Sequence, residues 1–232
     1  MLAILLAASL ASPGPQASSA PILRHMVFSA HVDSNGGMST AYRGANAGET
    51  GVPQLLGAQG HDDKNTTITV DVLAALDDGS LVVNVSEPKQ EPLKVAITSQ
   101  GALMSLTPSR LPTVGEHALL RMLARNFVAG HDDAPGNSWN LQYGPDNAGQ
   151  LHVGVSKNDG AHVVLDLKGT EFETQPETRR QQLSGTVTYD AAHTIPVSAD
   201  LSESVQVQNG NGTESMQYQA QFTLQSDSMG GS

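Results

Sequence analysis

Cysteine is absent from the 232 residues of this chain. Its absence excludes disulfide bonds, zinc sites with cysteine ligands and a thiol nucleophile. It also excludes a lipid-modified N-terminal cysteine, so we expect that the protein, if exported, is not a lipoprotein. The fold must therefore be stabilised without covalent cross-links. A domain of about this length buries roughly 70% of its unfolded surface, which is enough for a hydrophobic core.

Basic and aromatic residues are also scarce. The chain has 12 Lys and Arg against 23 Asp and Glu, which gives a formal net charge of −11. Nucleic acids and anionic membrane surfaces both attract basic proteins, so we expect neither as a partner. Aromatic residues make up 4% of the chain, which is low for a surface that stacks bases or sugars.

The first twenty residues resemble a signal peptide. Leu2 to Leu10 form an apolar run that is too short to span a bilayer, and small residues follow at Ser18, Ser19 and Ala20. We therefore expect residues 1–20 to be removed and the protein to be exported, either periplasmic or secreted. No Lys or Arg precedes the apolar run, which is atypical, and an apolar N-terminus of a cytosolic protein is the alternative interpretation.

One stretch, Thr113 to Gly130, reads as a long amphipathic helix. Thr113 and Glu116 have capping-box spacing, in which each side chain bonds a backbone N–H near the other residue. Gly130 is a plausible stop. Apolar residues recur at helical spacing on one face, at Leu119, Leu120, Leu123 and Phe127. The opposite face is predicted to carry His117, Arg121 and Arg125.

Most of the remaining chain alternates apolar and polar residues, as half-buried strands do. Asn35-Gly36-Gly37 is predicted as a turn between two strands, Gly44 to Asn65 as a long loop, and Asp77-Asp78-Gly79 as a hairpin turn. Counting such segments predicts ten to twelve strands in consecutive hairpins, an antiparallel meander with one apolar face.

These elements predict a mainly β (α+β) fold. A sheet with one apolar face must curl and be covered, and the single amphipathic helix is the available cover. We expect a curved antiparallel half-barrel in one domain, residues 21–226. A disordered tail is predicted for residues 227–232.

Gly-His-Asp-Asp occurs twice, at Gly60–Asp63 and Gly130–Asp133. Histidine nitrogen and carboxylate oxygen are ligands for zinc and other divalent ions. If the two segments met in space, a metal-dependent hydrolase would be one interpretation. Asp-rich turns are common, however, and no metal-binding motif surrounds either copy, so these remain weak candidates. They are His61, Asp63, His131 and Asp133.

Evidence for an enzyme is otherwise lacking. The chain has no G-x-S-x-G motif, and its paired carboxylates fall in predicted turns. We therefore predict no catalytic residue and no cofactor. Trp139 is expected to anchor the core rather than to mark a ligand-binding mouth.

The combined pattern resembles the periplasmic half-barrel proteins of the LolA and LppX type. The resemblance rests on the signal-like start, the antiparallel meander and the single helix, with the stretch LLRMLARNFVAGHDDAPGNSW from Leu119 to Trp139 and the stretch Gly185–Asp190 followed by Pro196. It implies a non-enzymatic envelope protein that holds a lipid-like or other apolar ligand between helix and sheet. Residues expected to line that groove are Leu119, Leu123, Phe127, Val187, Tyr189, Phe222 and Leu224.

Two other interpretations stay open beside this one. The same apolar residues are more often found in a filled core without a ligand, which is the more common interpretation of such a pattern. The second is a structural or interaction module whose acidic loops meet a partner, with an envelope protein rather than an apolar small molecule as that partner.

Overall fold

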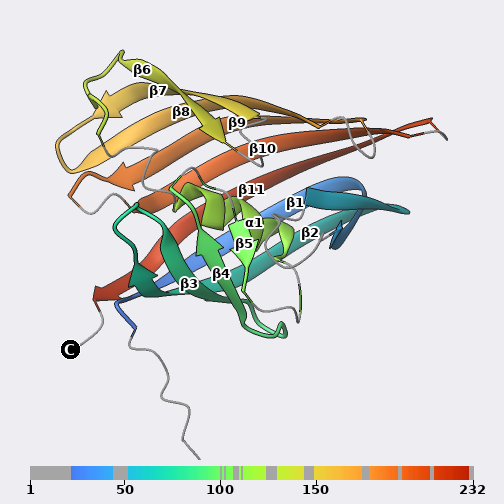
Figure 1. Cartoon of the computed structure of the whole chain (residues 1–232), viewed down its shortest axis with the longest axis horizontal. Coiled ribbons are helices and arrows are strands. Elements are labelled where there is room, and N and C mark those ends of the chain that lie inside the picture. The colour runs from blue at the N-terminus through green and yellow to red at the C-terminus, as the bar shows by residue number, and fades with distance from the viewer. Residues whose placement is uncertain are drawn as a thin grey trace, which may run out of the picture.

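The computed structural model describes residues 22–43, 52–99, 101, 103–106, 110, 112–123, 130–143, 149–173, 178–192, 195–209 and 212–229. Within this part, eleven strands form one sheet and a single helix accompanies it (Figure 1). The elements are β1 Arg24–Arg43, β2 Val52–Ala75, β3 Leu81–Ser86, β4 Leu93–Ile97, β5 Leu103–Ser105, α1 Val114–Met122, β6 Ser138–Tyr143, β7 Gly149–Asn158, β8 His162–Glu173, β9 Thr178–Asp190, β10 Pro196–Asn209 and β11 Gly212–Met229. The predicted mainly β meander with one helix is confirmed.

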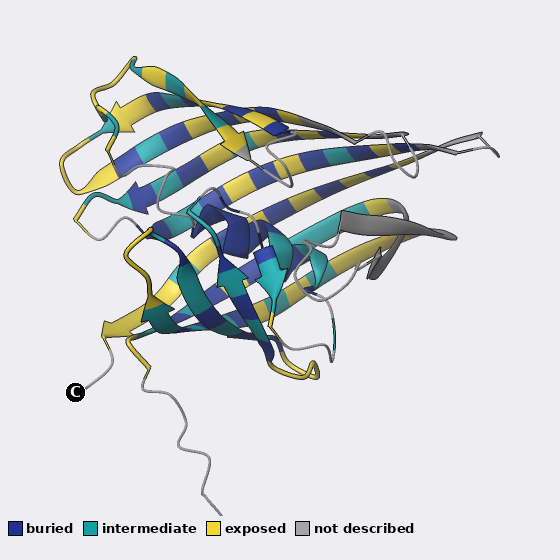
Figure 2. Ribbon diagram, in the orientation of Figure 1, coloured by how far each residue is buried: buried dark blue, intermediate teal, exposed yellow. Residues whose placement is uncertain are grey.

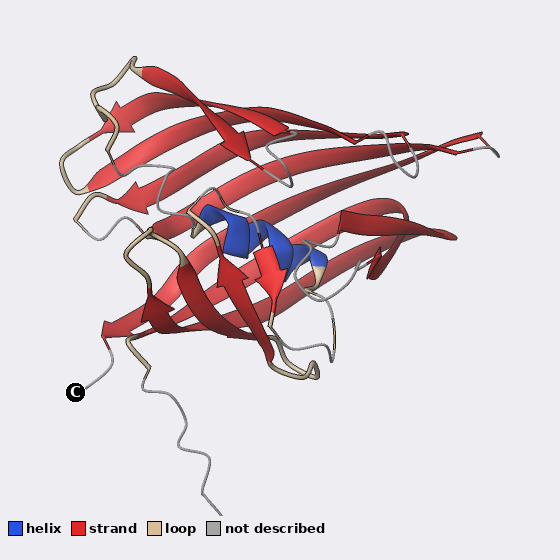
Figure 3. Cartoon of the chain, in the orientation of Figure 1, coloured by secondary structure: helices blue, strands red, loops and turns tan. Residues whose placement is uncertain are grey.

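The sheet is open, and all its neighbouring strands are antiparallel. Its order is β5-β4-β3-β2-β1-β11-β10-β9-β8-β7-β6. The first five strands therefore run outward from the centre to one edge, and the last six return from the other edge to pair with β1. Helix α1 lies between β5 and β6 in sequence, so it belongs to the connection that links the two edges of the sheet (Figure 3).

Strict alternation of side chains gives the sheet a buried inner face. On β7 the pattern of buried and exposed residues changes at every position from Gly149 to Val155, and Figure 2 shows the same banding along the neighbouring strands. Successive side chains of a strand point to opposite faces, so a period of two separates core from solvent. The core includes residues of the helix and inward residues of every strand except β6, whose Trp139 and Leu141 pack against it partly buried.

Helix α1 lies over the middle of the inner face. It contacts the two central strands, β1 and β11, and also the edge strand β5. Gly115 permits this close approach, because a Cβ at this position would lie 3.1 Å from Cγ2 of Val32 on β1. Seven of the nine helical residues are buried. The helix is therefore enclosed on most sides, whereas the sequence pattern predicted one wet face.

Two of the predicted local features are wrong. The turn at Asn35-Gly36-Gly37 lies within β1, which runs on to Arg43, and much of the loop predicted at Gly44–Asn65 belongs to β2. The two strands stay paired beyond Gly36 through irregular registers near Met38. Hydrogen bonding to a neighbouring strand outweighs the local turn preference of glycine, and bulges absorb the misfit.

The ends of two elements also differ from the prediction. The helix begins where expected but ends at Met122, with Leu123 as its C-cap, well before Gly130. Residues 124–129 lie outside the described residues. Strand β11 runs to Met229, so the first three residues of the predicted disordered tail are paired with β1, and Asp227 forms an ion pair with Arg24 at 2.6 Å. Residues 230–232 and the predicted signal peptide also lie outside the described residues.

Candidate functional site between the helix and the sheet

A buried polar network holds the beginning of α1. The capping box is present: the Thr113 hydroxyl accepts from the backbone N–H of Glu116 at 3.2 Å, and the Glu116 carboxylate accepts from the Thr113 N–H at 2.9 Å. Arg110 donates two hydrogen bonds to the same carboxylate, at 2.6 and 2.7 Å. The Glu116 side chain is fully buried. The pairing satisfies this carboxylate and fixes the helix start.

A second carboxylate ties this network to the sheet. Glu87, just after β3, accepts from the Thr113 hydroxyl at 2.9 Å and also pairs with Lys64 of β2. The Glu87 side chain is 1% exposed, whereas that of Lys64 is 43% exposed. Arg110 also donates to the backbone carbonyl of Glu91 in the loop before β4. The start of the helix is thus bound to β2 and to the loops that border β3 and β4.

A single hydrogen bond holds the other end of α1. Tyr189 of β9 donates its hydroxyl to the backbone carbonyl of Met122 at 2.6 Å. The carbonyls of a last helical turn lack partners within the helix, so this bond satisfies one of them in a buried setting. Burial raises the pKa of Tyr189 above its ordinary value, which keeps the phenol protonated and able to donate.

The predicted polar face of the helix is not solvated. Arg121 is buried, contrary to the prediction, and His117 is half-buried. Burial lowers the pKa of His117 to about 3, and the nearby Arg121 charge adds to this effect. His117 is therefore neutral at physiological pH. Packing around the helix thus buries Arg121 and leaves His117 only partly exposed, and Arg125 lies outside the described residues.

Most of the residues predicted to line a groove are buried in the hydrophobic core. Leu119 and Val187 are 0% exposed, and Tyr189 is 1% exposed. Phe222 and Leu123 are also buried, Leu224 is partly buried against the core, and Phe127 lies outside the described residues. Their exposure is so low that side chains already fill the space at these positions. The structure therefore places these residues in the packed core, and their role in ligand binding stays a prediction.

A buried acidic residue on the inner face was missed. Glu203 of β10 is 2% exposed and accepts hydrogen bonds from Gln181 of β9 and Tyr218 of β11. A signal was present in the sequence, because Glu203 falls in phase with the apolar positions Leu201 and Val205. An acidic residue at an inward position needs partners, and the neighbouring strands supply them.

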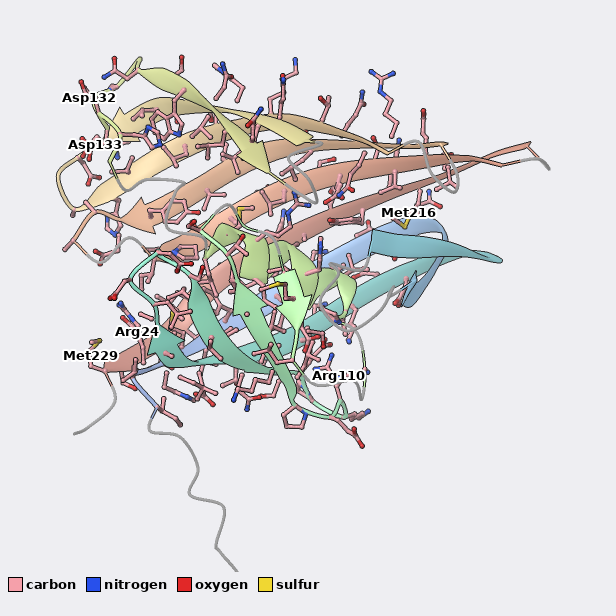
Figure 4. The ribbon with its side chains drawn as sticks, in the orientation of Figure 1. Arg24, Arg110, Asp132, Asp133, Met216 and Met229 are labelled. Carbon is pink, nitrogen blue, oxygen red and sulfur yellow. The ribbon has the colours of Figure 1, made fainter. Side chains whose placement is uncertain are left out.

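The two Gly-His-Asp-Asp segments are not brought together. His61 and Asp63 lie on β2, whereas His131 stacks on Trp139 of the edge strand β6, with ring centroids 4.3 Å apart. Figure 4 places Asp132 and Asp133 beside that edge. In the part of the chain described here, no three His, Asp or Glu side chains are gathered closely enough to hold an ion. The predicted hydrolase site thus lacks its geometry.

His61 and Asp63 have other partners, which sequence reasoning did not foresee. On the outer face, His61 Nδ1 lies 3.1 Å from a carboxylate oxygen of Asp33, and His31 Nδ1 lies 3.4 Å from one of Asp63. A similar pair, His25 and Asp71, has a separation of 2.6 Å. All three pairs join β1 to β2. Strand pairing rather than loop similarity selects these neighbours.

The Trp139 side chain packs partly buried against the core, as predicted for an anchor. Its indole Nε1 is buried and has no hydrogen-bond partner among the described residues.

No helix in the described part of the chain has the length and hydropathy needed to cross a membrane.

Comparisons with known proteins do not assign a family. No family model and no characterised protein match the sequence. A solved structure titled "Lipid-protein interactions in lipovitellin" aligns over 92% of this chain with a TM-score of 0.45 and 7% identity. The match covers 26% of the lipovitellin chain, so this chain spans about a quarter of its length. A likeness at this level carries no argument about function, and it does not single out the LolA and LppX type.

Proposed function

We propose that this protein is a non-enzymatic, exported protein of the cell envelope that binds a lipid-like ligand on the inner face of its sheet, where α1 now lies. The observation that carries the proposal is a mismatch of size between a broad apolar face and its small cover. Among the described residues, α1 is the only helix on that face, and it contacts mainly the central strands. The apolar run in residues 1–20 supports export.

The mismatch is large. Ten steps of about 4.8 Å separate the outermost strands, so the sheet measures about 48 Å across along its curve. A nine-residue helix is only about 14 Å long. Apolar inward side chains continue well beyond the helix, for example on β7 and β8, where other protein atoms bury them to an exposure of 3% or less. An extended acyl chain has the shape and the chemistry to lie along such a face.

The proposed ligand would exchange with α1 rather than enter an existing hollow. Leu119 and Val187 are fully buried by protein atoms, so no ligand reaches either side chain while the core stays packed in this way. The helix is retained by separable contacts at its two ends, Arg110 with Glu116 and Tyr189 with Met122. Release of these contacts exposes the apolar face to a ligand that replaces the buried surface of the helix.

A disulfide that locks the helix to the sheet tests this proposal directly. A Cβ at Gly115 would lie 3.1 Å from Cγ2 of Val32. That distance is close to the separation of about 3 Å between Cβ and the partner sulfur that disulfide geometry requires. We expect the Gly115→Cys, Val32→Cys variant to form one defined bond, because the chain has no other cysteine.

Binding of a fluorescent fatty acid is then measured in oxidised and reduced protein. We expect the reduced variant and the unaltered chain to bind, and the oxidised variant to lose binding. Equal binding in both redox states would contradict the exchange of helix and ligand. Absence of binding in every form, together with an apo mass for protein purified from its host in native mass spectrometry, would contradict the ligand-binding function itself.

A further inference from the structure

Strand β6 forms one edge of the open sheet. Within the described residues it pairs with β7 alone, and Figure 1 shows it along the rim of the molecule. The opposite edge is better protected, because β5 has only three residues and is contacted by α1. Very short edge strands and covering helices are two ways in which proteins prevent pairing with other chains. Strand β6 has six residues, and the main contacts of α1 are with β1, β11 and β5.

The sequence of β6 also lacks the residues that usually protect an edge. Ser138 to Tyr143 read SWNLQY, without a charged residue or a proline. Charged side chains, lysine above all, and proline keep exposed edges from pairing with other chains. The whole chain has a formal net charge of −11, so an uncharged edge is where a second copy can approach with little repulsion at short range.

Backbone groups of alternate β6 residues point away from the sheet. The Val155 N–H donates to the carbonyl of Asn137 at 2.8 Å, just before β6 begins. Bonded and non-bonded positions alternate in an antiparallel ladder, so every second residue after Asn137 is bonded to β7 as well. The N–H and C=O groups of Ser138, Asn140 and Gln142 therefore face the open edge, where no described strand pairs with them.

The inward side chains of β6 are incompletely covered. Trp139 and Leu141 pack only partly buried against the core, whereas the apolar inward side chains of β7 and β8 in that core are at most 3% exposed. His131 stacks on the Trp139 ring, with ring centroids 4.3 Å apart, yet the tryptophan stays partly exposed. A further strand beside β6 would bury both side chains more completely.

We propose that β6 pairs with β6 of a second copy of this chain, antiparallel about a twofold axis perpendicular to the sheet. Such an axis keeps the same face of both sheets on one side, so the two inner faces join. Inward residues must lie opposite inward residues, and a register centred on Asn140 meets this condition. The interface is independent of ligand binding on the inner face.

The strand is complementary to itself in this register. Trp139 lies opposite Leu141 of the second copy, and Ser138 lies opposite Gln142, so apolar residues meet apolar ones and polar residues meet polar ones. Asn140 lies opposite its own copy at the axis. The backbone groups that face the open edge come together in hydrogen-bonded pairs.

Antiparallel pairing also separates the acidic loops of the two copies. Asp132 and Asp133 lie in the loop before β6, beside this edge (Figure 4). In the proposed register the starts of the two β6 strands are four residues apart along the joint, or roughly 14 Å. That separation exceeds the Debye length of about 8 Å at physiological ionic strength, so salt screens the repulsion between these loops.

Sedimentation velocity of the full chain at increasing protein concentration tests this inference. We expect a monomer–dimer equilibrium for the unaltered protein. Asn140→Pro removes an N–H that faces the open edge and no bond to β7, so it blocks the pairing and keeps the sheet. Asn140→Asp places two like charges opposite each other at the axis with little change of shape. Each variant should raise the dimer dissociation constant by about tenfold or more.

The matched control is Gln150→Asp, which adds the same charge at an exposed position of β7, one strand in from the edge. It should dimerise as the unaltered chain does. Trp139 is the only tryptophan, so its fluorescence gives a second measurement. Its emission should shift to the blue with rising concentration in the unaltered chain and the control, but not in the two Asn140 variants. Circular dichroism verifies that each variant is folded.

A single cysteine tests the register. The chain has no other cysteine, and residues opposite each other in a hydrogen-bonded pair have Cα atoms about 5.5 Å apart, which a disulfide can span. Oxidation should link two copies of Asn140→Cys and leave Gln150→Cys unlinked. The inference is overturned if either Asn140→Pro or Asn140→Asp dimerises as tightly as the unaltered chain, or if Asn140→Cys does not cross-link. A monomer at every concentration would also overturn it, in favour of a different chain as the partner of this edge.

Discussion

Strands β1 and β2 present two opposite chemistries on a shared backbone. Their inner face is apolar, with Met26, Phe28, Ile68 and Val70 each at most 1% exposed. Their outer face carries three histidine-carboxylate pairs between the same two strands. The difference in polarity between the two faces arises only from the alternation of side chains. The strand register and the backbone hydrogen bonds are common to both faces. Polar groups on the outer face stay hydrated, whereas those on the inner face must be paired completely.

The largest expected change in the free energy of unfolding comes from breaking the buried ion pair at the start of α1. Glu116→Ala removes the partner of Arg110 and one half of the capping box. We expect a loss of about 3–5 kcal/mol in the free energy of unfolding, because Arg110 is left poorly solvated without its carboxylate. Urea denaturation measures the change. The control Lys157→Ala breaks an exposed ion pair and should leave stability unchanged within error.

Truncation of an inner-face side chain should have the next largest effect. Ile68→Ala deletes buried methyl groups that pack beneath the helix, with an expected cost of about 2–5 kcal/mol. The outer-face neighbour Thr67 is exposed, and Thr67→Ala should change the free energy of unfolding by no more than about 0.5 kcal/mol. Similar denaturation midpoints for these two variants would contradict the difference between the faces.

Removal of the hydrogen bond at the C-terminal end of α1 should lower the free energy of unfolding by an intermediate amount. Tyr189→Phe leaves the Met122 carbonyl without its hydroxyl donor and keeps the aromatic ring in place. We expect a loss of about 1–3 kcal/mol, which is the usual cost of an unsatisfied buried acceptor. Hydrogen exchange of the α1 amides should rise at the C-terminal end more than at the N-terminal end. Uniform exchange would show that this bond does not retain the helix.

The smallest expected effect at neutral pH comes from His117, because its contribution to the free energy of unfolding changes only in acid. Burial holds the pKa of His117 at about 3, whereas the unfolded chain has the ordinary value of 6.5. The unfolded state therefore binds an extra proton between these values, and this residue lowers stability as pH falls from about 6.5 to 3. Above pH 6.5 its contribution is constant.

The pH effect of His117 is isolated by comparison with a neutral variant. Stability of His117→Gln should fall less steeply between pH 6 and 4 than that of the unaltered chain, as measured by urea denaturation at each pH. The outer-face variant His25→Gln serves as the comparison for an exposed histidine. If His117→Gln retains the full slope, the imidazole is not kept neutral by burial.

Local sequence patterns predicted the capping box at Thr113 and Glu116 and the alternating strands, because both depend on residues close together in the chain. They failed at Gly36 and in the first half of β2, where pairing with a neighbouring strand overrides turn preference. The burial of Arg121 was also missed. Helical periodicity shows which residues share a face, but the enclosure of that face depends on what packs around it.

In the candidate site too, local sequence predicted some features and tertiary packing decided the others. Leu119, Val187 and Tyr189 were predicted to line one groove, and all three are buried in one hydrophobic core, which the pattern alone did not distinguish from an open groove. His61 and Asp63 were selected as metal-ligand candidates for their chemistry. Their true neighbours, His31 and Asp33, follow from the register of two strands whose connection the sequence had assigned to a loop.

The sequence by itself determined the class of the fold, since a period of two in apolar residues and a single capped helical segment leave little choice but a one-sided sheet with a cover. Only the tertiary structure decided which carboxylates lie opposite each other and which cationic side chains form ion pairs with them. Those pairings join residues far apart in the chain, such as Arg24 with Asp227, and their energies arise from burial and strand register that no local pattern encodes.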